Sequence, residues 1–318
     1  MTETAFMSLE EARLCQVAVR AISLEKFLKM EIPPRKLLLA PWLPAQGIAM
    51  IFAQRGIGKT HFALSVAYAV ASGGSFLGWK APEAKRVLFI DGEMPAVAMQ
   101  ERLASIIAGN DLTPTEGFLQ LVTPDLQHAA IPDLSSSEGQ EAIEPLLADT
   151  KLVILDNIST LFRSGVENDA ESWAPVQAWV LHLRRRGISS MFVHHAGKGG
   201  EQRGTSRRED VLDTVIRLKR PADYSTSDGA RFEVHFDKAR SLSGNEIYAI
   251  EAKLETLDGV ASWTTKALDD CLTESVAACL NEGLTVRDAA KELGIGKSSV
   301  SRHKRHAKER DLLNLDIR

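Results

Sequence analysis

Cysteine is scarce in this chain: the 318 residues hold three, Cys15, Cys271 and Cys279. They are too few and too scattered for a disulfide framework or a zinc knuckle, so we expect them to be buried packing residues. No apolar run approaches the length of a membrane span. Residues 1–27 contain acids and lack a cationic start followed by an apolar core, so nothing marks export. These absences predict a cytoplasmic protein with no membrane part.

The composition is typical of a soluble globular protein, with 44% hydrophobic and 25% charged residues. The length exceeds one average domain and predicts an enzyme-sized unit with a small additional module. The net charge of −4 is unevenly distributed. Residues 285–318 hold nine Lys or Arg and five Asp or Glu, so the remaining chain holds 29 basic and 37 acidic residues. The C-terminal segment is therefore the basic part of the chain.

One glycine-rich segment has the pattern of a phosphate-binding loop that opens a helix. The apolar residues 48–52 precede it as a predicted strand, and residues 61–71 follow with apolar side chains at helical spacing. The expected nucleotide-binding residues are Ala53, Gln54, Arg55, Gly56, Ile57, Gly58, Lys59, Thr60 and His61.

In a loop of this kind, backbone N–H groups and the positive helix end surround the phosphate oxygens. Lys59 would reach the β- and γ-phosphates, and the Thr60 hydroxyl would ligate Mg²⁺. Ala53 stands where the first Gly is usual, although Gly56 and Gly58 remain at the tightest part of the turn. An ordinary glycine-rich turn is the alternative, and the strand–loop–helix context favours nucleotide binding.

The middle of the chain alternates predicted strands with predicted helices. Strands are expected at residues 86–90, 151–155 and 188–193, and helices at 95–108 and 172–186. Continuous apolar strands separated by helices predict an α/β fold, with a mostly parallel sheet covered on both faces. Ligands of such sheets bind at the carboxyl ends of the strands. The polar residues that follow the strands are therefore candidates for chemistry.

Two carboxylates follow predicted strands in this way. Asp156 suits a carboxylate that holds Mg²⁺, and its successor Asn157 cannot be the base that many ATPases carry beside this Asp. Glu93, at another strand end, is the natural replacement as acceptor of the attacking water's proton. Each acid alone is more often a helix cap or a solvated turn, but their register with the phosphate-binding loop favours catalysis.

Two adjacent histidines close another strand. His194 and His195 point to opposite faces of a strand, which argues against shared metal ligation. His195 is the better candidate for a hydrogen bond to the γ-phosphate. For His194, the alternative is an ordinary buried histidine with its own hydrogen bonds.

Further cations follow the double histidine. Lys198, Arg203, Arg207 and Arg208 lie in a flexible loop and would contact a phosphate backbone, with a solvated surface loop as the alternative. A later strand, residues 232–237, ends in Lys238-Ala239-Arg240. These two cations, or Arg203, are candidates to act in a neighbouring subunit's site, as arginine fingers do; ordinary surface charge is the alternative.

The C-terminal segment reads as three short helices, at residues 274–280, 285–293 and 298–310. Thr285 would cap the second helix, with Asp288 in its first turn. The spacing resembles a helix-turn-helix domain, with a generic three-helix protein-binding module as the alternative. The residues expected near DNA are Lys297, Ser298, Ser299, Ser301, Arg302, Lys304 and Arg305.

Taken together, these motifs resemble the RecA-like ATPases, and within them the RepA-type hexameric helicases of plasmids and the DnaB replicative helicases. Residues 87–94 are similar to the DnaB segment that ends in a catalytic Glu, residues 192–196 to the double-His strand end of RepA, and residues 238–240 to the Lys-x-Arg of DnaB-like enzymes. The resemblance covers residues 39–254. It implies ATP and Mg²⁺ as cofactors, His195 as γ-phosphate sensor, and a homo-oligomer, expected to be a hexamer, with single-stranded DNA in its channel.

These inferences divide the chain into an N-terminal arm and linker (1–38), a RecA-like ATPase domain (39–268) and a helix-turn-helix domain that binds double-stranded DNA (269–318). The leading hypothesis is an oligomeric Mg²⁺-dependent ATPase acting on DNA, a RepA-like helicase or motor of a plasmid or mobile element. The alternative is an ATP-switched DNA-binding regulator without strand-separating activity. A partition-type ATPase is disfavoured because Gln54-Arg55 replaces the extra loop Lys of such proteins.

One segment leaves two alternatives open. Residues 32–44 are apolar and punctuated by proline, which excludes a long helix. The segment would lie either across an adjacent subunit, with Trp42 as an anchor, or along its own domain.

Overall fold

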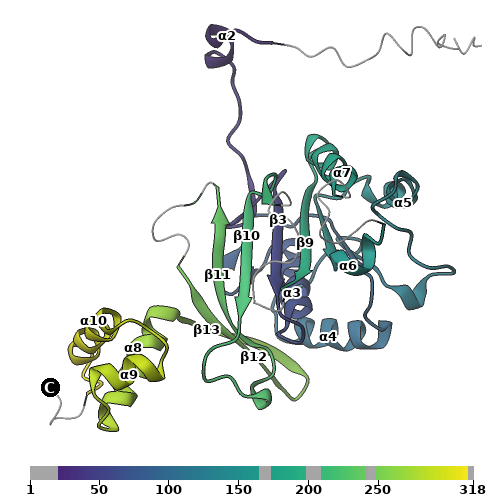
Figure 1. Ribbon diagram of the computed structural model, residues 1–318. Helices are drawn as coiled ribbons and strands as arrows, with labels where there is room; N and C mark the ends of the chain where they lie inside the picture. The colour runs from purple at the N-terminus through teal and green to yellow at the C-terminus, as the bar shows by residue number, and fades with distance from the viewer. Residues whose placement is uncertain (1–20, 165–172, 198–208, 241, 243–247, 314–318) are drawn as a thin grey trace, which may run out of the picture. The chain divides into compact units, whose positions relative to one another are not determined.

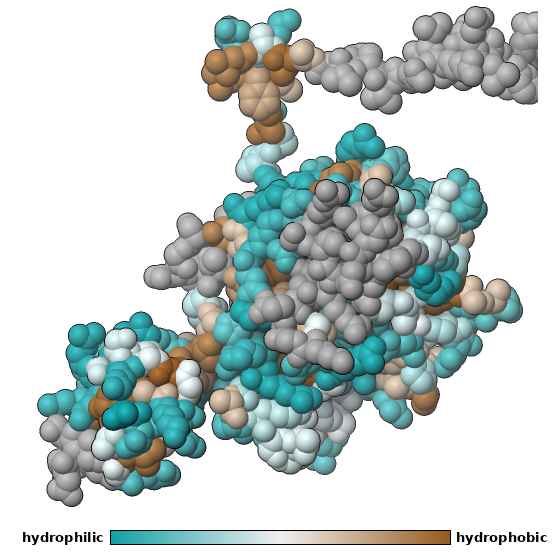
Figure 2. All heavy atoms as spheres, viewed as in Figure 1, coloured by the Kyte–Doolittle hydropathy of each residue, from teal (hydrophilic) through white to brown (hydrophobic). Residues whose placement is uncertain are grey.

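A computed structural model describes residues 21–164, 173–197, 209–240, 242 and 248–313 of the protein (Figure 1). The chain divides into two units, Met1–Arg35 and Lys36–Arg318. The first unit contains helix α2 (Leu24–Leu28). Ser23 caps its N-terminus, because the Ser23 side chain accepts a hydrogen bond from the Lys26 backbone N–H. This helix has exposed apolar side chains, and its segment is largely brown in Figure 2.

The second unit is built on one large sheet, which has nine strands within the described residues. Its order is β13-β12-β11-β10-β3-β9-β8-β6-β7. Neighbours are parallel from β10 to β7 and antiparallel from β10 to β13. This mostly parallel sheet with flanking helices confirms the α/β class that the sequence predicts. The strands are β3 (Ile48–Ala53), β6 (Val87–Asp91), β7 (Leu119–Val122), β8 (Leu152–Asp156), β9 (Ser189–His195), β10 (Thr214–Lys219), β11 (Arg231–Ala239), β12 (Ile250–Leu257) and β13 (Val260–Ala267).

Helices cover both faces of the parallel strands (Figure 1). Strand β3 shows why, because Ile51 packs in one core with Phe62, whereas Met50 packs in a second core with Trp179. Alternate side chains point to opposite faces, so a strand that is covered twice is apolar throughout. Within the described residues, no helix combines the length and apolar character needed to cross a membrane. The helices are α3 (Lys59–Ser72) and α4 (Ala96–Ala108) on one face, and α5 (Ser137–Ile143), α6 (Ile158–Leu161) and α7 (Ala174–Arg185) on the other.

The proline-punctuated segment forms a hairpin of β1 (Leu37–Leu39) and β2 (Leu43–Pro44). Between these strands, Trp42 is buried and meets Trp79 edge-to-face, with 5.5 Å between the ring centroids. Trp79 belongs to a second small hairpin, β4 (Ser75–Phe76) with β5 (Trp79–Lys80). Of the two alternatives for Trp42, packing within its own unit is therefore the one observed.

Three helices end the described chain: α8 (Leu268–Asn281), α9 (Val286–Glu292) and α10 (Lys297–Glu309). As predicted, Thr285 caps α9, because its Oγ1 accepts a hydrogen bond from the Asp288 backbone N–H at 3.2 Å. The helices share a separate apolar core that includes Ala289 and Val300. Helix α8 begins at Leu268 rather than at the predicted residue 274, and its first turn carries Asp269 and Asp270, whose charges favour a helix N-terminus.

Candidate active site

The parallel register brings four strand ends together at one edge of the sheet. Ala53, the last residue of β3, pairs with His195 at the end of β9, and Asp91 of β6 pairs with Asp156 of β8. These ends border a cavity of about 290 Å³. It is lined by Gly56, Gly58, Lys59, Thr60, His61, Glu93, Arg102, Asp156, Asn157, His195 and Ala230. The structure thus brings five of the nine predicted loop residues into one cavity with Glu93, Asp156 and His195. The other four loop residues, Ala53, Gln54, Arg55 and Ile57, do not line it.

The phosphate-binding loop needs glycine where the chain turns most tightly. Gly58 has φ +112°, and a Cβ there would lie 3.0 Å from the Cβ of Ala230. A left-handed backbone in contact with another segment excludes other residues. The position of Ala53 does not require glycine, because Ala53 is the last residue of β3 and pairs with His195 as an ordinary strand residue. The Cβ of Ala is therefore compatible with this position.

Lys59 begins α3 and turns its side chain back into the loop. Its Nζ donates hydrogen bonds to the carbonyls of Ala53 at 3.1 Å and Gln54 at 2.8 Å. Burial lowers the pKa of Lys59 to about 8, while the charges of Asp156 and Glu93 oppose the shift. The ammonium is still charged at neutral pH and can exchange the two carbonyls for phosphate oxygens.

Asp156 and Thr60 form the part of the cavity that suits a metal. The Asp156 carboxylate is buried and hydrogen-bonds the Thr60 side chain, and burial raises its pKa to about 7. Its Oδ2 atom has no hydrogen-bond partner among the described residues. A buried carboxylate oxygen without a donor, beside a hydroxyl, fits a hard cation such as Mg²⁺. These two residues would hold the metal.

Glu93 is positioned by two neighbours. The Oδ1 atom of buried Asp91 accepts hydrogen bonds from the backbone N–H groups of Met94 and, at 2.8 Å, Glu93, which fixes the turn after β6. The Nδ2 atom of Asn157 donates to Glu93 Oε2 at 2.8 Å. The sequence singles out Asn157 only as a missing base, whereas the structure gives it a contact with the proposed base.

The remaining cavity residues include Arg102, which the sequence does not single out. Burial lowers the pKa of His61 to about 4, with a further contribution from the Arg102 charge, so this imidazole is neutral. Arg102 comes from α4 and brings a second cation to the cavity beside Lys59. Its signal in the sequence is a charge on the helix face that also carries buried Met99 and Ile106.

Comparison with known proteins gives the family. Residues 15–201 match the family described as AAA domain, which is more than half of the chain. The chain belongs to the AAA domain family. It is a P-loop ATPase. The chain is also similar to the crystal structure of a KaiC-like protein from the hyperthermophilic archaeon Pyrococcus horikoshii OT3, with 15% identity and a TM-score of 0.48 over 71% of this chain and 93% of that chain.

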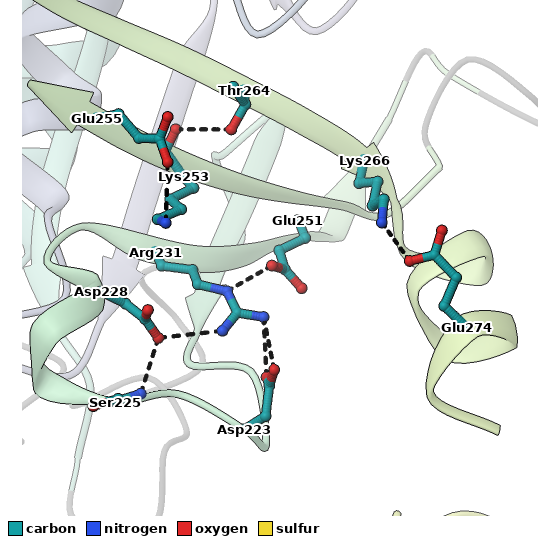
Figure 3. Close-up of polar contacts among 10 residues, drawn as sticks. All are labelled: Asp223, Ser225, Asp228, Arg231, Glu251, Lys253, Glu255, Thr264, Lys266 and Glu274. Carbon is teal, nitrogen blue, oxygen red and sulfur yellow. Dashed lines mark hydrogen bonds and ion pairs between the residues drawn. The ribbon is translucent and has the colours of Figure 1, made fainter. Parts of the chain in front are cut away.

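The connection between β10 and β11 of this AAA-domain protein borders its phosphate-binding loop. Arg231 donates to Asp223 at 3.0 Å, Asp228 at 3.2 Å and Glu251 at 2.7 Å (Figure 3). These three carboxylates raise the pKa of Arg231 further above its usual range. Ala230, which directly precedes Arg231, lines the cavity. Asp223 and Asp228 lie in the connection itself, whereas Glu251 reaches Arg231 only because β11 pairs with β12.

Two predicted cations of this ATPase lie elsewhere. Lys238 donates to the Glu209 carbonyl and Arg240 to the Asp210 carbonyl, and neither lines the cavity around Lys59. On α10, Lys297, Ser298, Ser301, Arg302 and Arg305 are exposed, while Ser299 and Lys304 are half-buried. The predicted loop cations Lys198, Arg203, Arg207 and Arg208 lie outside the described residues.

Proposed function

We propose that this P-loop ATPase is an oligomeric, Mg²⁺-dependent enzyme that acts on DNA as a RepA-like helicase or motor. The observation that carries the proposal is the convergence of Lys59, Glu93, Asp156 and His195 on one cavity. A cation, a candidate base, a metal-binding carboxylate and a hydrogen-bonding group are the parts that hydrolysis of a nucleoside triphosphate requires.

Each side chain has a defined task in this proposal. Lys59 neutralises the β- and γ-phosphate oxygens, and Thr60 with Asp156 holds Mg²⁺. When bound, Mg²⁺ supplies positive charge to the phosphate oxygens. Glu93 accepts the proton of the attacking water through Oε1, since Asn157 occupies Oε2. His195 contacts the γ-phosphate from the end of β9, which leads into residues 198–208.

The oligomer in the proposal rests on the cations of β11. Lys238 and Arg240 do not line the cavity of their own chain. Arginine fingers often act from a neighbouring subunit on the transition-state charge. These residues are the proposed trans-acting cations, and the resemblance to RepA-type helicases supports a hexamer.

The DNA partner rests on charge. Lys297, Arg302 and Arg305 lie exposed on α10, the last of three small helices that share a core. A basic helix of such a unit fits the phosphates and base edges of a major groove. The same helices also support the alternative function, an ATP-switched DNA-binding regulator that separates no strands.

Hydrolysis and strand separation test these proposals in turn. ATP turnover with Mg²⁺ is measured with and without single-stranded DNA for the wild type, Lys59→Ala and Glu93→Gln. Glu116→Gln, an exposed carboxylate outside the cavity, is the matched control. We expect Lys59→Ala to lose turnover and Glu93→Gln to bind ATP but turn over about 10²- to 10⁴-fold more slowly.

The second stage uses a forked DNA substrate and ATP. Strand separation supports the helicase, and DNA-stimulated turnover without strand separation supports the regulator. Near-normal turnover of Lys59→Ala would remove the site assignment, and turnover that is indifferent to DNA would remove the DNA partner.

A further inference from the structure

A cluster of metal-ligating side chains lies in the C-terminal helices, outside the cavity of the ATPase site. Asp269 comes from the first turn of α8, and His303 and His306 lie three residues apart on α10. One ligand atom from each falls within 4.8 Å of the others. His303 Nε2 is 3.8 Å from Asp269 Oδ1, and His306 Nδ1 is 4.0 Å from Asp269 Oδ2.

The buried histidine of this cluster is held in the tautomer that a metal requires. The Thr273 hydroxyl donates to the Asp269 backbone carbonyl at 2.8 Å. Its oxygen therefore accepts from His303 Nδ1, which lies 2.9 Å away. With the proton on Nδ1, Nε2 carries a lone pair and faces Asp269. Metal-binding histidines are usually oriented by such a hydrogen bond on the other ring nitrogen.

A cation already contacts these atoms. The Arg302 guanidinium is 3.2 Å from His303 Nε2 and 3.4 Å from Asp269 Oδ1. Arg302 holds this position with a side chain that is 52% exposed, so it can turn into solvent at little cost. The arrangement is thus a pair of acceptors that converge on one positive charge.

We propose that Asp269, His303 and His306 bind one divalent transition-metal ion of the Zn²⁺ class, which displaces Arg302. Two imidazole nitrogens and a carboxylate suit Zn²⁺, Co²⁺ or Ni²⁺, whereas Mg²⁺ and Ca²⁺ prefer oxygen ligands. Ligand atoms of a tetrahedral Zn²⁺ site lie about 3.3 Å apart, given metal–ligand distances of about 2.0–2.1 Å. Exposed Asp269 and half-buried His306 can close the remaining gap by side-chain rotation.

The proposed ion joins two helices that are distant in sequence. It ties the first turn of α8 to the middle of α10 and so stabilises the three-helix core. Binding to the folded state alone raises the melting temperature of these helices with metal concentration. The site is independent of ATP hydrolysis.

Metal titration of the full chain tests the proposal. Zn²⁺ binding is measured by calorimetry with excess Mg²⁺ present, and Co²⁺ binding by its visible absorption. We expect one ion per chain, with affinity reduced about tenfold or more in Asp269→Asn and His306→Gln. Thr273→Val keeps all three ligands but loses the orienting hydrogen bond, and should weaken binding about 10- to 100-fold. Arg302→Ala removes the competing cation and should therefore tighten metal binding.

The matched control is His128→Gln, which removes an exposed histidine far from the cluster in sequence. Its affinity should equal that of the wild type. Circular dichroism of each variant without metal shows whether the helices remain folded. No binding by the wild type, or binding of equal affinity in Asp269→Asn and His306→Gln, would show that Arg302 and its partners form an ion-pair network only.

Discussion

The side-chain amide of Asn157 donates a hydrogen bond to the Glu93 carboxylate, joining residues 64 positions apart. Asn157 directly follows Asp156 at the end of β8, and Glu93 follows the neighbouring strand β6. The amide takes one carboxylate oxygen and leaves the other for a water molecule. A residue that cannot be a base thus orients the proposed base.

Asn157→Ala is expected to slow hydrolysis by about tenfold or more, because a hydrogen bond to a charged group contributes about 1.5–3 kcal/mol. The loss should appear in kcat, while the affinity for ATP stays near that of the wild type, since Lys59 and Asp156 are untouched. Steady-state kinetics with Mg²⁺ measure both. Asn110→Ala, at an exposed amide after α4, is the matched control. An unchanged kcat would show that Glu93 needs no positioning by Asn157.

The affinity for Mg²⁺–nucleotide should fall as the pH drops below about 7. Burial raises the pKa of Asp156 to about 7, and the carboxylate must be ionised to hold the metal. Below that pH, binding must release a proton, so affinity should fall by up to about tenfold per pH unit. Titration with a non-hydrolysable analogue between pH 5 and pH 8 measures the slope, and a flat profile would contradict the assignment.

The same carboxylate should lower the stability of the protein without nucleotide at neutral pH. Its pKa is raised from 3.8 to about 7 in the folded state, so its stabilising contribution is full below pH 3.8 and is lost as the pH rises through 7. Asp156→Asn does not titrate. Its melting temperature should exceed that of the wild type by a margin that grows from pH 4 to pH 7 and then levels off. A difference in melting temperature that does not change with pH would show that ionisation of Asp156 does not lower the stability.

The sequence predicts the parallel core because its strands are continuous apolar runs, as in residues 152–155 of β8. It also predicts the convergence of Glu93 and Asp156, since parallel strands end at one edge. It misses Arg102, whose direction depends on how α4 packs. It misses β7 as well, because Leu119–Val122 has only partly buried and exposed residues and lacks the continuous apolar run of a core strand.

Arg102→Ala should weaken binding of the triphosphate more than that of the diphosphate, because the guanidinium adds positive charge to the cavity beside Lys59. We expect a loss of about tenfold or more in kcat/KM for ATP. Arg102→Lys should restore only part of the lost kcat/KM, because an ammonium lacks the planar, two-pronged geometry of a guanidinium. Affinities for ATP and ADP analogues measure the difference, with Gln100→Ala on the exposed face of α4 as control. Equal losses for both nucleotides would place Arg102 away from the terminal phosphate.

Arg231→Met should raise KM for ATP while leaving kcat nearly unchanged. Arg231 holds the β10–β11 connection through Asp223, Asp228 and Glu251, and this connection ends at Ala230 against Gly58. Methionine keeps much of the stem but removes the cation that three carboxylates share, at a cost of about 1–3 kcal/mol. Hydrogen exchange should therefore rise across residues 221–229. Lys253→Met, which removes a half-exposed ion pair with Glu255 on the next strand, is the matched control. Unchanged exchange together with an unchanged KM would show that the connection needs no clamp.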